Sequence, residues 1–302
     1  MLNEIKEIPY KAKEFLASSK EYKLPLHIPY LGMGSSYFAP LAFKYMGVAI
    51  YPEIASEYFY YLKEHNKTGE AVILSQSGKS SEALWCSGIV ERYTAITNDA
   101  QSPLAVNAKM VIDIKAGRED YSSSKTYVNT LLALFKGFGM DTSKVVENLL
   151  NSIGAYEQMG NEIARKIFDL LQKKRVNGFY ITGSGPNIAT AMEAALILSE
   201  MTKIGFQGLP LAQYDHGPKE TAAHSIVIQI VSKGNAYKRN AQVRQSIEDA
   251  GATVFAIEEV LADEFSSILY NIIPFNFIGY YLANLLQVKD TFAVGNKVTE
   301  VE

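Results

Sequence analysis

The residues best suited to chemistry in this chain lie between Ala71 and Trp85, where a short apolar run ends in a cluster of hydroxyl groups. The run from Ala71 to Leu74 predicts a buried parallel strand, and a helix is expected to begin near Ser80. A turn of this kind directs free N–H groups and the positive end of a helix dipole at one point, which predicts a site for a phosphate monoester. The hydroxyl groups belong to Ser75, Ser77, Ser80 and Ser81.

The same loop also has a simpler interpretation. It lacks the GxxxxGK[ST] pattern, so we do not expect it to bind a nucleoside triphosphate. The alternative to a phosphate site is a serine-rich cap on an ordinary helix. Lys79 adds a positive charge to the loop, which suits the phosphate interpretation.

Short apolar strands alternate with helical segments along the whole chain, and the second half repeats the plan of the first. This alternation predicts an α/β fold in which each domain is a doubly wound parallel sheet flanked by helices. The turn at Gly183 matches the turn at Gly32 with an offset of 151 residues (183 − 32). We therefore expect two tandem copies, residues 1–150 and 151–302, with the serine loop and a single phosphate site in the first copy.

The composition is that of an ordinary two-domain protein of 302 residues. The net charge of -3 gives no reason to expect a nucleic acid or an anionic membrane as partner. Cys86 is the one cysteine, so an internal disulfide and a cysteine metal cluster are excluded. The first residues lack the apolar core of a signal peptide, and the apolar stretch 269–286 is interrupted by polar residues and a proline. We expect a cytoplasmic protein.

Six short motifs then occur in the order in which a known family carries them. They are GMGSS at 32–36, EIASE at 53–57, SQSG at 75–78, SSSK at 122–125, HGP at 216–218 and the tail NKVTEVE at 296–302. In these motifs the chain resembles the sugar isomerase (SIS) proteins, specifically the double-SIS isomerase half of glutamine–fructose-6-phosphate aminotransferase. The resemblance implies two tandem SIS domains that bind a sugar 6-phosphate.

The resemblance also implies which residues bind that substrate. The first turn and the serine loop would hold the phosphate, and a serine of the SSSK turn would contact the sugar. The matching positions are Ser36, Ser75, Gln76, Ser77, Ser80 and, for the sugar contact, Ser123.

Three catalytic groups follow from the resemblance as well. Glu200 would shuttle a proton between C1 and C2, and His216 would assist ring opening from a neighbouring subunit. Lys297 would form a Schiff base with the open-chain ketose. The role of His216 implies a homodimer, and the scheme needs no metal or organic cofactor.

The residues support part of this scheme independently of the resemblance. Glu193 and Glu200 lie on one face of an apolar helix, and desolvation there would suit Glu200 to act as a general base. Glu193 is expected to be structural. The simpler alternatives are a surface glutamate at Glu200, a loop histidine at His216 and a solvated lysine at Lys297.

The chain departs from the aminotransferase pattern at several points. The resemblance covers the isomerase half alone, so we expect a protein without the glutaminase half. Ile197 stands where the family has a lysine, and Lys79 stands where the synthase has an acid. These departures favour a glucosamine-6-phosphate deaminase, which would release ammonia from glucosamine 6-phosphate. The alternatives are a fructosamine-6-phosphate deglycase, the isomerase subunit of a split aminotransferase, and a non-catalytic sugar-phosphate sensor. We also expect the tail to dock and to carry Lys297 toward the serine loop.

Overall fold

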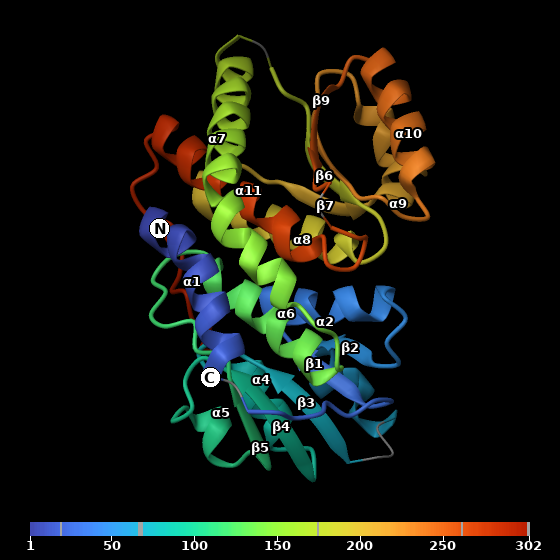
Figure 1. The fold of residues 1–302 in the computed structure, drawn as a ribbon. Coiled ribbons are helices and arrows are strands. Elements are labelled where there is room, and N and C mark those ends of the chain that lie inside the picture. Colours follow the sequence, from blue (N-terminus) through green and yellow to red (C-terminus); the bar gives the residue numbers. More distant parts are fainter. Residues whose placement is uncertain (19, 66–68, 174, 261, 301–302) are drawn as a thin grey trace. The chain divides into compact units, whose positions relative to one another are not determined.

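The computed structural model describes residues 1–18, 20–65, 69–173, 175–260 and 262–300, which form two compact units (Figure 1). We call residues 6–147 with the tail from Phe292 the first-sheet unit, and residues 1–5 with 148–291 the second-sheet unit. The change of unit after Glu147 and the expected boundary at residue 150 both fall within helix α7 (Ser143–Lys173). The expected division placed the tail with the second copy, whereas its contacts group it with the first sheet.

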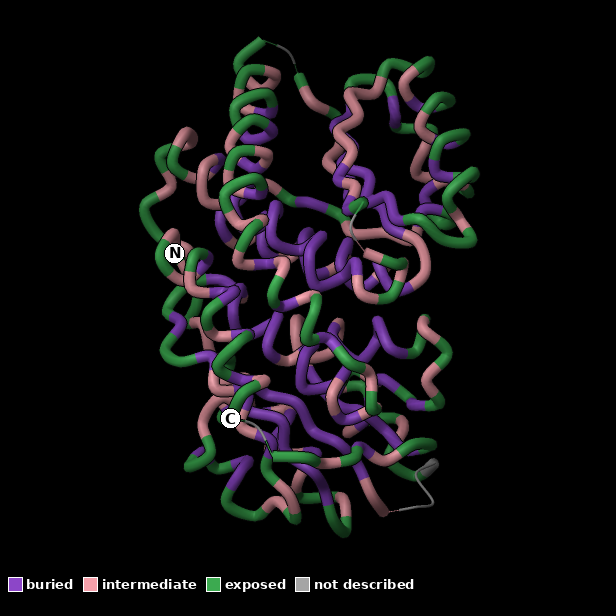
Figure 2. The backbone as a smooth tube through the Cα atoms, viewed as in Figure 1, coloured by how far each residue is buried: buried purple, intermediate pink, exposed green. Residues whose placement is uncertain are grey.

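The first-sheet unit is built on five parallel strands in the order β2-β1-β3-β4-β5. Buried apolar residues run along the central strands (Figure 2). The strands are β1 (Pro29–Gly32), β2 (Tyr51–Ile54), β3 (Glu70–Leu74), β4 (Arg92–Thr97) and β5 (Met110–Asp113). The helical segments are α1 (Leu2–Ser18), α2 (Ser35–Tyr45), α3 (Ala55–Glu57), η1 (Tyr58–Leu62), η2 (Lys63–His65), α4 (Ser81–Ser87), α5 (Pro103–Val106) and α6 (Lys125–Gly137).

The second-sheet unit has four parallel strands in the order β7-β6-β8-β9. Helices α8 and α11 pack against each other, and most of α11 is buried. The strands are β6 (Phe179–Gly183), β7 (Gln207–Pro210), β8 (Ile226–Val231) and β9 (Thr253–Glu258). The helical segments besides α7 are α8 (Asn187–Thr202), α9 (Leu211–Asp215), η3 (Pro218–Thr221), α10 (Tyr237–Asp249) and α11 (Ile268–Leu285).

The expected duplication is visible in one detail of both sheets. A Cβ atom on Gly32 would lie 2.5 Å from the carbonyl of Ser36, and one on Gly183 would lie 2.1 Å from the carbonyl oxygen of Asn187. The two pairs differ by the 151-residue offset read from the sequence. In both copies the helix after the first strand therefore approaches too closely for any side chain. The predicted α/β fold with two doubly wound parallel sheets is confirmed.

The sequence also predicts a helix over residues 1–18 with a break at Pro9 and a second strand at residues 48–50, and both details are wrong. A break at Pro9 is expected, yet α1 continues through it. Pro9 removes one helical hydrogen bond, but Ile8, Ala12 and Phe15 have no exposed surface, and burial of this face holds the helix together. The second strand is expected at residues 48–50 and lies instead at Tyr51–Ile54, because its register is set by pairing with β1.

Two further findings limit what the chain can do. Cys86 is fully buried, its Sγ lies 3.2 Å from the carbonyl oxygen of Ala55, and burial raises the pKa of the thiol to about 12. Such a thiol is not a nucleophile at neutral pH. Within the described ranges, none of the helices is long and apolar enough to cross a membrane.

Candidate functional site

The serine loop joins the end of β3 to the start of α4, and its hydroxyl groups bond within the loop. Ser75 is buried, and its Oγ accepts a hydrogen bond from the amide of Gly78 at 3.1 Å and donates to Ser80 Oγ at 3.3 Å. Ser77 Oγ accepts from the amide of Lys79 at 3.2 Å. Ser80 is the N-cap residue of α4, yet its side chain caps no amide within the described chain. The alternative of a simple serine cap therefore does not account for the loop.

The loop is braced from the neighbouring strand. The carbonyl oxygen of Gln76 accepts hydrogen bonds from Thr97 Oγ1 at 3.3 Å and from the amide of Asn98 at 3.0 Å. Gly78 has a φ of +63°, and a Cβ there would lie 2.0 Å from Ser102 Oγ. A side chain at this position would be strained, and the hydrogen bonds from Thr97 and Asn98 hold the loop in its shape.

Ser36 and Ser123 belong to the same unit as the serine loop. Ser36 is half-buried in the first turn of α2, which follows β1, and β1 pairs in parallel with β3. The turn of Ser36 and the serine loop therefore leave the sheet at the same edge, where ligands of open α/β sheets bind. Ser123 is half-buried in the SSSK turn that leads from β5 into α6.

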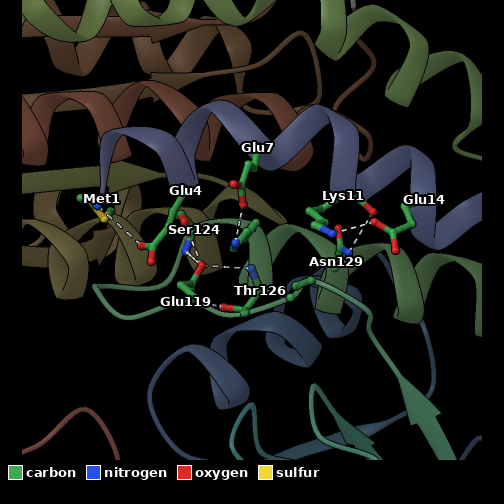
Figure 3. Close-up of polar contacts among 12 residues, drawn as sticks. Met1, Glu4, Glu7, Lys11, Glu14, Glu119, Ser124, Thr126 and Asn129 are labelled. Carbon is green, nitrogen blue, oxygen red and sulfur yellow. Dashed lines mark hydrogen bonds and ion pairs between the residues drawn. The ribbon is translucent and has the colours of Figure 1, made fainter.

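The SSSK turn is held by a carboxylate, Glu119, that none of the sequence motifs contains. The side chain of Glu119 has no exposed surface. One of its oxygens accepts hydrogen bonds from the amide and the hydroxyl of Ser124, at 3.0 and 2.8 Å, and from the amide of Thr126 at 3.3 Å. The other accepts from Thr126 Oγ1 (Figure 3). Glu119 thus caps α6 from outside the helix.

The tail docks on the first-sheet unit, as expected, but Lys297 lies at the SSSK turn. The amide of Ser81 donates to the carbonyl oxygen of Thr299 at 3.3 Å, which places the tail at the start of α4. Lys297 Nζ donates to the carbonyl oxygens of Glu119 (2.7 Å) and Tyr121 (2.5 Å) and lies 3.2 Å from the Glu119 carboxylate. These three acceptors match the three hydrogens of an ammonium group. The last two residues of the tail motif lie outside the described residues.

Glu200 lies in the last turn of α8, in the second-sheet unit. It is half-buried, whereas Glu193 on the same helix is fully buried. The expected desolvation is therefore stronger at Glu193 than at Glu200. The carbonyl oxygen of Glu200 accepts a hydrogen bond from Lys203 Nζ at 2.7 Å, which closes the carboxyl end of the helix.

His216 is exposed and follows the short helix α9 of the second-sheet unit. The neighbouring acid, Asp215, does not serve it as a dedicated partner. The Asp215 carboxylate accepts hydrogen bonds from Lys219 and Arg239, each at 3.0 Å, and these hold its pKa below the ordinary value. The role in a neighbouring subunit that the resemblance implies for His216 stays a prediction.

In the second copy an acid packs against the turn that corresponds to the serine loop. A Cβ on Gly234, which follows β8, would lie 2.2 Å from the carboxyl carbon of Glu264, and one on Gly185 would lie 3.2 Å from its Oε1. Glu264 thus lies against both glycine turns of this sheet edge, where its charge opposes an anion. This favours the expectation of a single phosphate site in the first copy.

The site residues expected from the sequence therefore divide between the two units. Seven of them lie in the first-sheet unit, namely Ser36, Ser75, Gln76, Ser77, Ser80, Ser123 and Lys297. Glu200 and His216 lie in the second-sheet unit. In the part of the chain that the structure describes, no group of three or more histidine, cysteine, aspartate or glutamate side chains could hold a metal ion.

Comparison with solved structures identifies the fold as that of phosphosugar isomerases. The chain superimposes on a glucosamine-6-phosphate deaminase from Thermotoga maritima with a TM-score of 0.81, at 19% identity and over 99% of each chain. It matches the C-terminal domain of glucosamine-fructose-6-phosphate aminotransferase from Francisella tularensis with a TM-score of 0.76, at 21% identity and over 96% of each chain.

The sequence comparison adds particular relatives. The chain is 25% identical over 279 residues to the glutamine–fructose-6-phosphate aminotransferase of Sulfolobus acidocaldarius, a match that covers 84% of this chain and 45% of the relative. It spans about half the length of the curated relatives it matches. No family model matches the chain. These relatives confirm the resemblance to the isomerase half of the aminotransferases that the six motifs indicate.

Proposed function

We propose that this chain is a sugar-phosphate isomerase that acts as a glucosamine-6-phosphate deaminase. It would convert glucosamine 6-phosphate and water to fructose 6-phosphate and ammonia. The observation that carries the proposal is the docking of the tail, because the Ser81–Thr299 hydrogen bond brings the segment with Lys297 to the unit that holds the serine loop. The neighbour from Thermotoga maritima, which is named a glucosamine-6-phosphate deaminase and covers 99% of this chain, supports the same reaction.

The serine loop would bind the phosphate group. Phosphate oxygens accept charge-assisted hydrogen bonds from hydroxyl and amide groups, and the loop offers both in a fixed shape. Ser36 would complete the phosphate site from the adjacent strand end, and Ser123 would bind a sugar hydroxyl. In this scheme the phosphate residues of the loop are Ser75, Gln76, Ser77 and Ser80.

The chemistry would begin with ring opening. His216 of a neighbouring subunit would transfer the proton that opens the pyranose, which makes a homodimer the smallest active assembly. Glu200 would then remove the proton from C2 and return it to C1. This step converts the open-chain 2-amino aldose to the imine of the ketose at C2. It is an isomerisation with no net oxidation or reduction.

Lys297 would complete the reaction. Its free amine would attack C2 and expel ammonia, and water would then hydrolyse the lysine Schiff base to fructose 6-phosphate and regenerate the amine. Lys297 must first lose a proton and leave the acceptors at Glu119 and Tyr121. All of these steps use side chains of this protein and water, so the scheme includes no metal or organic cofactor.

The proposal is tested by measuring ammonia and ketose from the purified protein with glucosamine 6-phosphate. A fructosamine 6-phosphate and unphosphorylated glucosamine serve as parallel substrates. We expect equal amounts of ammonia and fructose 6-phosphate from glucosamine 6-phosphate, and little from glucosamine. Turnover of the fructosamine 6-phosphate alone, or binding without turnover of any of the three, would show that the proposed reaction is wrong.

A further inference from the structure

We infer that Glu119 is a positioning residue. Its one buried carboxylate fixes both the resting position of Lys297 and the start of helix α6. The link itself is a property of the structure. Its consequence for catalysis rests on the proposed function, in which Lys297 becomes the nucleophile.

The contacts of Glu119 exceed what capping of α6 requires. Its Oε1 alone receives the hydrogen bonds from Ser124 and the Thr126 amide, and this would satisfy the helix end. Its Oε2 faces Lys297 Nζ at 3.2 Å, and its backbone carbonyl accepts from the same Nζ at 2.7 Å. Glu119 therefore binds Lys297 through both its carboxylate and its carbonyl oxygen, and it also caps α6.

Another capped helix in the first-sheet unit shows what capping alone looks like. Asp141 Oδ1 accepts hydrogen bonds from the amide and the hydroxyl of Ser143, at 2.9 and 2.7 Å, at the start of α7. Asp141 is exposed, whereas the side chain of Glu119 is fully buried. Burial of a carboxylate is unfavourable unless the charge is paired, and Lys297 supplies the opposite charge. The burial of Glu119 is thus explained by the pair and not by the cap.

Through this arrangement Glu119 sets the positions of Lys297 and of Ser123, the expected sugar contact. Ser123 precedes Ser124 in the turn that Glu119 fixes, and Lys297 is bound to the same carboxylate. Loss of the carboxylate charge would free the lysine from its resting place but would leave the serine loop intact, because no bond of the loop described above includes Glu119. We therefore expect a change in the rate of Schiff-base formation and not in the affinity for the phosphate.

Trypsin tests the link without any substrate. It cleaves after Lys297 only when Nζ leaves Glu119 and enters the protease pocket, and the released peptide is measured by mass spectrometry. We expect Glu119→Gln to accelerate this cleavage about tenfold relative to the unmodified protein. Glu7→Gln is the matched control, because Glu7 pairs with Lys125 at the start of the same helix. Equal cleavage in all three proteins would overturn the inference.

A second variant keeps the inference testable if Glu119→Gln does not fold. Lys297→Met removes the cation and leaves the hydrogen bonds of Glu119 to Ser124 and Thr126. The Ser81 amide donates a hydrogen bond to Thr299, so its hydrogen exchange then reports how firmly the tail is docked. We expect faster exchange at Ser81 in Lys297→Met and unchanged exchange in Lys125→Met. Unchanged exchange in both would overturn the inference.

The catalytic consequence is measured separately. With glucosamine 6-phosphate, Glu119→Gln is expected to lower kcat about tenfold, because a lysine without a fixed resting place starts each turnover from many positions, and to change KM less than about twofold. If Glu119 only capped the helix, Glu119→Gln would change neither the rate of trypsin cleavage after Lys297 nor the yield of a borohydride-trapped adduct on Lys297. Faster trypsin cleavage in the variant together with no adduct in the unmodified protein would contradict the proposed function and leave the link standing. Unchanged cleavage would refute the link whatever the activity.

Discussion

The amide of Ser81 donates a hydrogen bond to the carbonyl oxygen of Thr299 across 218 positions of the sequence (299 − 81). A first-turn amide of a helix has no partner inside that helix, and here the tail supplies one. The tail is therefore a structural part of the α4 start and not a loose extension of the second-sheet unit.

Removal of one loop hydroxyl should weaken phosphate binding selectively. We expect Ser77→Ala to lose about 1–2 kcal/mol of binding free energy for fructose 6-phosphate, or roughly tenfold in Kd. Binding of unphosphorylated fructose should hardly change. Titration calorimetry measures both, with Ser87→Ala on helix α4 after the loop as the control, since Ser87 Oγ donates a hydrogen bond to the Leu84 carbonyl oxygen. Equal losses for both sugars would place the phosphate elsewhere.

The tail lysine should be the site of covalent trapping. Borohydride added with fructose 6-phosphate is expected to reduce a Schiff base to a stable adduct on Lys297. Lys297→Arg should abolish the adduct, because a guanidinium stays protonated, while phosphate binding persists. Peptide mass spectrometry locates the adduct. Its appearance on another lysine, or normal turnover by the variant, would exclude the Schiff-base role of Lys297.

The serine loop should not tolerate a side chain at Gly78. In Gly78→Ala the new Cβ would meet Ser102 Oγ at 2.0 Å, in addition to the strain of a φ of +63°. Gly139→Ala is the matched control, since Gly139 has a φ of +74° and open space around it. We expect Gly78→Ala to lower the free energy of unfolding by about 1–3 kcal/mol more than the control does. Urea denaturation measures the difference, and equal losses would show that Ser102 moves aside freely.

Pairing of two inactive variants should test the partner role of His216. If each site uses its own Glu200 and His216 of the other subunit, then a mixed dimer of Glu200→Gln and His216→Asn has one complete site. Random co-assembly should restore about a quarter of the sites. Activity of the separate and co-expressed proteins measures this. Full activity of a monomer, or no restoration on co-expression, would contradict the arrangement.

The Asp215 ion pairs should appear in the acid stability of the protein. Lys219 and Arg239 lower the pKa of Asp215 from 3.8 in the folded state. A lowered folded-state pKa stabilises the protein above 3.8, and this contribution is lost as the pH falls through the folded-state pKa. We expect Asp215→Asn to reduce the dependence of the unfolding free energy on pH in that acid range. Urea unfolding at several pH values measures it, and an unchanged pH dependence would show that the pairs add no stability.

The sequence predicts local elements well and distant contacts poorly in this chain. The strand and the helix on either side of the serine loop are predicted to within one residue of where β3 and α4 lie, because an apolar run and a hydroxyl-rich turn are local signals. The short strand β7 is missed, since Gln207–Pro210 contains little that marks a strand. Glu119 is missed for a different reason. Its partners Ser124, Thr126 and Lys297 become neighbours only on folding, and an acid before a hydroxyl-rich turn is a weak signal by itself.

The contact of Glu264 with the glycine turns of the second sheet bears on how a duplicated fold can come to do two things. A carboxylate packed against these turns places a negative charge where the first copy offers hydroxyl and amide groups, and this charge repels an anion. Under the proposed function, the second copy would then not compete for the substrate phosphate. The residues proposed for proton transfer, Glu200 and His216, lie in this copy.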